Sequence, residues 1–182
     1  MQPIMLALAM LSLLGAGLPV QAQLRKAGAE IRGCTDPTIT GRARLIELPS
    51  REGVKQVIVE LAVSGLSEGQ HAVHIHETAA CDPCAAAGGH FDPGPNGNPS
   101  PDGNHPFHAG DLINITVREG RGVLFTLTSR VTLAPGPLSI FDADGSAVII
   151  HTNPDTYCPD GEVAGCAGGG RAACGIIVPM EE

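Results

Sequence analysis

Every second residue is apolar along several short segments of the chain, and this alternation predicts β-strands. In the segment 55–64, Val and Leu occupy alternate positions, whereas Gln56 and Glu60 stand among the residues between them. Period-two alternation is typical of an antiparallel strand with one buried face. Similar alternation or short apolar runs occur at 40–47, 113–117, 124–127, 147–150 and 172–178. No segment has a convincing helical period.

Turn-forming sequences separate these segments and complete an all-β pattern. They read SREG at 50–53, EGRG at 119–122 and DADG at 142–145, and Gly, Asp and Ser favour turns for known conformational reasons. Short strands joined by such turns predict a small β-sandwich or β-barrel.

Two long segments, 77–109 and 152–171, have no strand pattern and are rich in Gly, Pro, Asp and Cys. Loops of this length in a compact domain are usually functional or disordered. Because the first contains two Cys and three His and the second contains two Cys, we expect both loops to be organised by disulfides and metal. No internal repeat or linker indicates a second domain.

The N-terminal segment 1–22 contains no charged residue and no His, and it is apolar from Ile4 to Val20. It ends in Val20-Gln21-Ala22, whose small residues suit signal-peptidase cleavage before Gln23. We therefore predict a signal peptide at 1–22, a domain at 23–182, and a secreted or periplasmic protein. A membrane anchor is the weaker alternative because the apolar run is barely long enough to span a bilayer, so no membrane association is expected after cleavage.

Composition limits which residues can form the core and which classes of partner the protein can bind. The only aromatic residues are four Phe and one Tyr, so a core must be built mainly from Val, Ile, Leu and Ala. Asp and Glu number 19 against 11 Lys and Arg, which gives a net charge of -8, and no basic cluster is present. These features exclude nucleic acid and anionic membrane as expected partners.

The histidines carry the clearest chemical signal. On a strand, His74 and His76 project from the same face and can converge on one metal ion. An isolated pair would often be two surface histidines, but the chain offers further candidate ligands at His90, His108, Asp111 and His151. Imidazole suits copper and zinc, and a carboxylate in a nitrogen-rich set is compatible with zinc. No Cys lies among these histidines at blue-copper spacing, which disfavours an electron-transfer cupredoxin.

With these residues in view, the sequence resembles the copper,zinc superoxide dismutase family over roughly residues 40–178. Five segments in the family's order carry the resemblance: GLSEGQHAVHIHE at 65–77, GHFDP at 89–93, HAGDL at 108–112, VIIH at 148–151 and GRAACG at 170–175. Each segment alone is weak evidence, but together they are very specific. The resemblance implies an eight-stranded Greek-key barrel with two long loops.

The resemblance also implies a reaction, two cofactors and a role for each site residue. The reaction is the disproportionation of superoxide to dioxygen and hydrogen peroxide, with copper cycling between Cu(II) and Cu(I) beside a zinc ion. The implied copper ligands are His74, His76, His90 and His151, and the implied zinc ligands are His90, which bridges both metals, His108 and Asp111. Asp155 would link a copper ligand to a zinc ligand, Arg171 would guide the anion, and His71 would make a structural hydrogen bond.

One departure from the family's pattern concerns zinc. The middle zinc histidine of the family precedes the His-x-Gly-Asp motif by nine residues, but in this chain that region reads Asn98-Pro99-Ser100. His105 is the remaining imidazole, and we expect a remodelled loop to bring it to the metal. The alternatives are a zinc site with three protein ligands plus water, or a copper-only protein in which His105 is a solvated loop residue.

Six cysteines allow 15 pairings. The resemblance implies a bridge from Cys84 to Cys174 that ties the metal loop to the barrel. Proximity then favours Cys158 with Cys166, and elimination leaves Cys34 with Cys81, although the pairing of these four stays open. A redox or zinc role for the CxxC at 81–84 is a minor alternative in an exported chain with no partner motif.

Two rival functions remain on the same scaffold: a copper-binding or copper-delivery module, and a structural domain without metal. The four copper imidazoles argue against the structural domain. Arg171 and Asp155 favour the enzyme over the delivery module, because a carrier has no use for an anion guide. We expect superoxide as the small-molecule substrate and consider a homodimer.

Overall fold

The computed structural model describes residues 24–50, 53–94, 105–161 and 163–181. The predicted signal peptide and its cleavage site lie outside these residues. Within the described ranges, no helix has the length and apolar character needed to cross a membrane.

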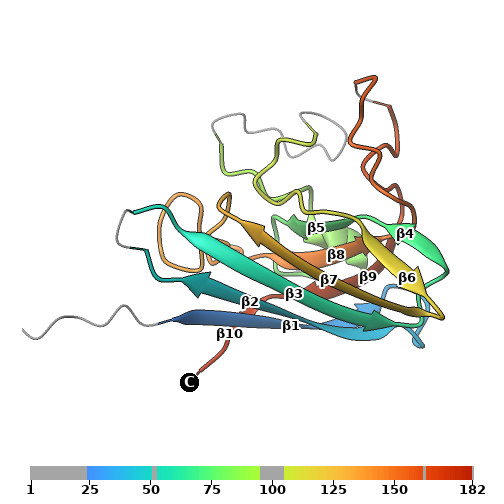
Figure 1. The fold of residues 1–182 in the computed structure, drawn as a ribbon, viewed down its shortest axis with the longest axis horizontal. Helices are drawn as coiled ribbons and strands as arrows, with labels where there is room; N and C mark the ends of the chain where they lie inside the picture. The colour runs from blue at the N-terminus through green and yellow to red at the C-terminus, as the bar shows by residue number, and fades with distance from the viewer. Residues whose placement is uncertain (1–23, 51–52, 95–104, 162, 182) are drawn as a thin grey trace, which may run out of the picture.

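Ten strands and one short 3-10 turn make up the regular structure of the described residues (Figure 1). The strands are β1 (Arg25–Gly33), β2 (Thr40–Leu48), β3 (Gln56–Ser64), β4 (Gly69–His71), β5 (Val73–His76), β6 (Ile115–Arg118), β7 (Arg121–Thr128), β8 (Ala147–His151), β9 (Arg171–Ile176) and β10 (Val178–Pro179), and the turn is η1 (Cys84–Ala87). Each of these strands pairs with its neighbours in the antiparallel direction.

The sheet is a nearly closed barrel. Its order is β4-β6-β7-β3-β2-β1-β9-β8-β5, with β10 paired to β1. The two outermost strands, β4 and β5, follow each other in the chain and are separated only by Ala72, so one interrupted strand joins both ends of the order. With that strand counted once and the two-residue β10 set aside, eight strands remain, and the predicted Greek-key barrel is confirmed.

Aliphatic side chains fill the barrel, as the composition predicted. The alternate apolar residues of β3, from Val57 to Val63, are each at most 3% exposed, and their pairing with β2 and β7 fixes which face of each strand points inward. Phe91 is the one fully buried aromatic side chain among the described residues. Phe107 and Phe125 lie at the surface, 70% and 68% exposed.

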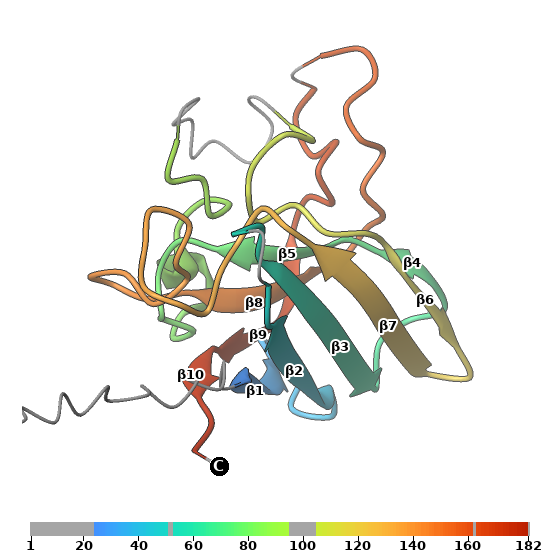
Figure 2. The same cartoon turned by 60° about the vertical axis from the view of Figure 1, so that its left-hand side comes forward.

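Both long loops leave the barrel at the same side (Figure 2). The first connects β5 to β6 and includes η1, and the second connects β8 to β9. Because β5 and β8 are antiparallel neighbours, the first loop leaves beside the start of β8 and the second leaves beside the start of β5, and His74 on β5 contacts His151 at the end of β8. The barrel therefore brings together the two segments that the sequence singled out.

Two predicted disulfide pairings are wrong. Cys84 pairs with Cys34, and Cys174 pairs with Cys81, whereas the Cys158–Cys166 bridge is confirmed. The four mispredicted residues gather in one cluster beside Ala147 and Ile149, because β1 and β9 pair at Arg32 and Cys174. Within such a cluster the partners depend on the local course of the 81–84 backbone, which neither resemblance nor elimination specifies.

Candidate metal centre

The β5–β8 strand pair holds three histidines of the first group. His74 and His76 lie on β5, opposite Ile149 and Ala147 of β8, and His151 ends β8 directly after a register shift in the pairing of β8 with β9. His90 reaches the same place from the first loop through a bridge with His76. All four imidazoles are at most 2% exposed.

These four imidazoles form a ligand set. Each of His74, His76, His90 and His151 offers one nitrogen, and the four nitrogens lie within 4.8 Å of one another. Two of the ring nitrogens, Nε2 of His76 and Nε2 of His90, have no hydrogen-bond partner among the described residues. Buried polar atoms normally have partners, so converging nitrogens of this kind fit a bound metal. An all-imidazole set suits copper.

The other ring nitrogen of each strand histidine fixes the ring's orientation. Nδ1 of His76 lies 2.9 Å from the carbonyl oxygen of Gly88, and Nδ1 of His151 lies 3.0 Å from that of Gly169. Nε2 of His74 lies 3.1 Å from the Asp155 carboxylate. When the N–H of a ring donates to such an acceptor, the opposite nitrogen keeps its lone pair for a metal.

A second group surrounds Asp111. Nδ1 of His90 lies 2.6 Å from Oδ1 of Asp111, and the Nδ1 atoms of His105 and His108 each lie 3.1 Å from Oδ2. A 4.8 Å ligand set joins His74, His90, His105 and Asp111; His108 is outside that set, although its Nδ1 is as close to Asp111 as that of His105. Three imidazoles and one carboxylate fit the ligand types of zinc.

His105 is buried and contacts both carboxylates of the centre. It is 7% exposed, so the alternative of a solvated loop residue is wrong. Its Nε2 lies 2.8 and 2.7 Å from the two oxygens of Asp155, while its Nδ1 faces Asp111. An imidazole three residues before His108 therefore contacts the same carboxylate as His108 does.

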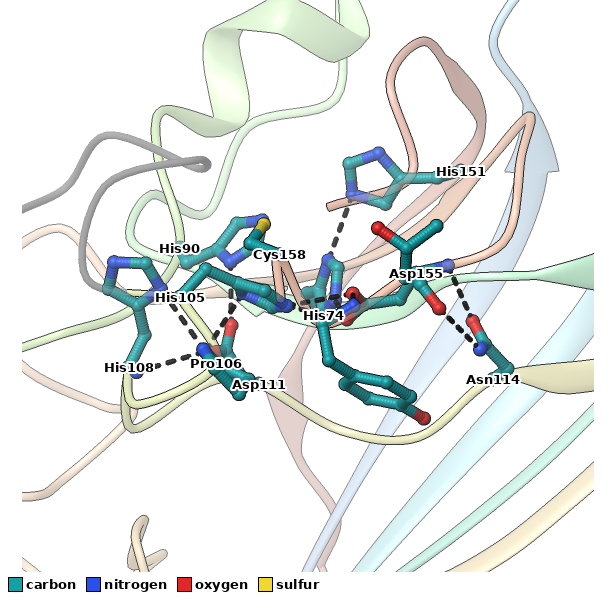
Figure 3. A network of polar contacts seen from close by, with 12 residues as sticks. His74, His90, His105, Pro106, His108, Asp111, Asn114, His151, Asp155 and Cys158 are labelled. Carbon is teal, nitrogen blue, oxygen red and sulfur yellow. Dashed lines mark hydrogen bonds and ion pairs between the residues drawn. The ribbon is translucent and has the colours of Figure 1, made fainter. Parts of the chain in front are cut away.

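Asp155 links the two groups of histidines (Figure 3). Its carboxylate contacts His74 on one side and His105 on the other. Asn114 holds the backbone of Asp155: its side-chain amide donates to the Asp155 carbonyl at 2.9 Å and accepts from the Asp155 N–H at 2.8 Å. Asn114 was not predicted from the sequence, where its only signal is a polar residue between apolar positions directly after the HAGDL segment.

Burial keeps the first group neutral. It lowers the pKa of His74 to about 3 and that of His151 to about 4, and it also lowers the pKa of His76 and of His90. Removal of an imidazole from water disfavours its charged form. At physiological pH these four rings therefore carry free lone pairs, which is the protonation state that metal binding needs.

The second group is charged before any cation binds. Burial alone would raise the pKa of Asp111 and of Asp155, but the neighbouring imidazoles hold the pKa of both carboxyl groups well below the usual range. Burial alone would lower the pKa of His105, but the same two carboxylates raise it to about 9. Two buried carboxylates with one imidazolium form a site that a divalent cation can enter by displacing a proton.

Arg171 lies at the start of β9 and reaches back to the first loop. Its Nη1 donates to the carbonyl oxygen of Cys84 at 2.6 Å, and its Nη2 donates to that of Gly88. Gly88 is also the acceptor for His76, so one carbonyl connects the arginine to the four-imidazole group. The positive charge of Arg171 contributes to the lowered pKa of His76 and of His151, as expected of a nearby cation.

The family model of copper/zinc superoxide dismutase (SODC) matches residues 39–177. The chain belongs to the copper/zinc superoxide dismutase family. A curated relative from Deinococcus radiodurans, superoxide dismutase [Cu-Zn], is 38% identical in an alignment 154 residues long, and the match covers 76% of this chain and 77% of that protein. Membership confirms the predicted family, the enzymatic activity of a superoxide dismutase, and copper and zinc as its metals.

His71 has the structural position expected of it in this superoxide dismutase. Its Nδ1 lies 2.8 Å from the carbonyl oxygen of His151, and its Nε2 lies 3.0 Å from that of Ser67. The ring therefore ties the start of the second loop to the segment before β4. It contacts the backbone of His151 and holds that residue in place beneath the centre.

Proposed function

We propose that the four-imidazole group of this superoxide dismutase binds copper and that the group around Asp111 binds zinc. The proposed copper ligands are His74, His76, His90 and His151, and the proposed zinc ligands are His90, His105, His108 and Asp111. One observation carries the proposal: Nδ1 of His90 lies 2.6 Å from Asp111, while its Nε2 lies among the other imidazoles without a hydrogen-bond partner among the described residues. A single ring therefore faces both groups.

The reaction converts two superoxide anions and two protons into dioxygen and hydrogen peroxide. Copper, when bound, supplies the one-electron Cu(II)/Cu(I) couple for this exchange. The residues of the chain then have three tasks: to hold the ligands still, to deliver a proton, and to attract the anion. In this proposal Nε2 of His90 holds a proton for the peroxide product, and Asp111 fixes the ring through Nδ1.

In this proposal Asp155 holds the copper ligands and the zinc ligands in a fixed position relative to one another. It accepts hydrogen bonds from Nε2 of His74 and from Nε2 of His105, so the Nδ1 atom of each ring is directed to its own metal. Partners of metal-bound imidazoles that fix the tautomer in this way raise ligand basicity and affinity. His105 thereby takes the place of the missing middle histidine.

Replacing His105 with Ala tests the zinc assignment. We expect zinc occupancy to fall while copper content stays largely unchanged, because His105 contacts Asp111 and Asp155 and is not part of the four-imidazole group. Metal content after dialysis, measured by mass spectrometry, gives the result. Phe107→Ala is the matched control, since Phe107 is in the same segment and 70% exposed. Full zinc occupancy in His105→Ala would show that His105 is not a ligand.

Arg171 is the proposed anion guide. A net charge of -8 repels superoxide, so fast turnover needs a local positive field at the copper group. Charged clefts raise the on-rate of small ions by about 10- to 1000-fold, and superoxide dismutase is itself one of the systems from which this scale comes. The guanidinium is partly exposed, and two carbonyl oxygens fix it beside the copper ligands.

We therefore expect Arg171→Ala to keep both metals and to lose about 10-fold or more in superoxide turnover. Its activity should also become less sensitive to added salt, because screening then has less attraction to remove. Pulse radiolysis at several ionic strengths measures both effects. Arg118→Ala, an equal change of charge at the exposed end of β6, is the control. Unchanged activity and salt dependence would refute Arg171 as the guide and would mean that another cation attracts the anion.

The three disulfides indicate an oxidising environment outside the cytoplasm. We further propose export by the segment 1–22, release of a mature chain that begins at Gln23, a secreted or periplasmic location without membrane attachment, and assembly into a homodimer. The N-terminal mass of the exported protein and its mass by sedimentation equilibrium test the start of the chain and the assembly state.

A further inference from the structure

Arg130 lies two residues after the end of β7 and contacts the segment that carries the zinc-side residues. Its Nη1 donates to the carbonyl oxygens of Pro106, at 3.2 Å, and of His108, at 3.0 Å. Its Nη2 donates to the carbonyl oxygen of Asp111. One guanidinium therefore contacts the backbone at three points between 106 and 111, and two of those points are proposed zinc ligands.

The contacted segment has little regular structure of its own. Its backbone is tied to the barrel at Gly110, which donates to Phe91 at 2.8 Å and accepts from Ile75 at 2.9 Å. Next to His105 the backbone has one donor fewer, because Pro106 has no N–H. The carbonyl of Pro106 accepts a hydrogen bond from Arg130, which ties this end of the segment to the barrel as well.

The base of Arg130 is fixed to the barrel. Its backbone N–H donates to Oγ1 of Thr128 at 3.1 Å. Thr128 is the last residue of β7 and pairs with Val57 of β3. A side chain anchored directly after a paired strand can hold a loop in place, whereas a side chain from another part of the loop would move with it.

We infer that Arg130 is a positioning residue for zinc. It fixes the curvature of 106–111 so that His105, His108 and Asp111 face one point. The need for such a residue follows from the unusual ligand spacing: His105 and His108 are only three residues apart, and a tight irregular turn between them must bring both imidazoles to the same carboxylate. The inference rests on the proposed zinc site.

Arginine is suited to this task in a way that lysine is not. A planar guanidinium presents several N–H donors in a fixed fork, and hydrogen bonds from a charged donor are stronger than neutral ones. A lysine ammonium is a point charge on a flexible stem and cannot reproduce three contacts at fixed angles. Arg130→Lys is therefore expected to position the zinc ligands in part, and Arg130→Gln to lose most of this positioning.

Zinc affinity of the oxidised, copper-free protein tests the inference, measured by competition with a chromophoric chelator. Loss of a residue that orients metal ligands typically costs about 10- to 100-fold in metal affinity, so we expect that increase in the zinc Kd for Arg130→Gln and a smaller one for Arg130→Lys. Cobalt(II) bound in place of zinc should show altered visible bands in Arg130→Gln. Arg121→Gln, at the other end of β7, removes the same charge. Its zinc Kd should stay within about 2-fold of that of the unsubstituted protein, since an exposed surface charge contributes little to interaction energies.

The outcomes are distinguishable. A zinc Kd and a cobalt spectrum for Arg130→Gln that match the unsubstituted protein would overturn the inference, even if the melting temperature of the metal-free variant were lower, because Arg130 would then serve the fold alone. If Arg130→Gln does not fold, the same comparison with Arg130→Lys decides. If the unsubstituted protein binds neither zinc nor cobalt, the proposed zinc site itself is wrong.

Discussion

Replacing Cys81 and Cys174 together with Ser is expected to lower the free energy of unfolding by roughly 4 to 5 kcal/mol. The two residues are 93 positions apart, and in the chain-entropy model a bridge that closes so long a loop removes about that much conformational freedom from the unfolded state. Denaturant unfolding of the metal-free, oxidised proteins measures the loss.

The bridge between Cys158 and Cys166 provides the control, since only 8 positions separate its ends. The same model gives roughly 2 to 3 kcal/mol for it. Equal losses from both double substitutions would contradict this ranking.

A peptide map of the unsubstituted protein should join Cys84 to Cys34, and a fragment that joins Cys84 to Cys174 would restore the pairing that the family resemblance implied.

Asp155→Asn is the second substitution with a large expected effect, because one carboxylate serves both proposed metal sites. An amide has a single oxygen and no charge, so it cannot accept equally from His74 and His105. We expect zinc affinity to fall by about 10- to 100-fold. The visible absorption of bound copper should shift as well, since the ring of His74 loses its fixed acceptor.

Asp160→Asn is the matched control for this substitution. Asp160 is exposed and belongs to the same loop as Asp155, so it tests the loss of one negative charge without loss of the link. Zinc titration and copper absorption spectra of the two variants together separate the effect of the lost link from the effect of the lost charge. A zinc affinity in Asp155→Asn equal to that in Asp160→Asn would mean that the link between the sites has no role in metal binding.

The sequence predicted those parts of the molecule that depend on periodicity. Alternation along β3 is unmistakable because large Val and Leu side chains occupy every inward position. β1 was missed because its inward residues include Ala27 and Ala29, which are buried at 0% and 5% exposure but contribute little to a hydrophobic pattern. The HxH of β5 was found because two imidazoles project from one strand face and further candidate ligands follow along the chain.

The parts that sequence could not predict depend on backbone geometry in the loops. Asn114 and Arg130 act through hydrogen bonds to main-chain atoms of Asp155, Pro106, His108 and Asp111, and any residue can supply a carbonyl. The cysteine pairing also depends on local backbone geometry, since four sulfur atoms in one cluster can be joined in more than one way. The resemblance supplied the site residues but not the local supports that hold them.

Superoxide consumption measured while copper is titrated into the zinc-loaded, oxidised mature protein tests the central claim most directly. Four imidazoles that converge within 4.8 Å are the proposed copper site, so activity should rise in proportion to added copper and stop rising at one equivalent. Copper that binds tightly at that stoichiometry without superoxide-consuming activity would contradict the account.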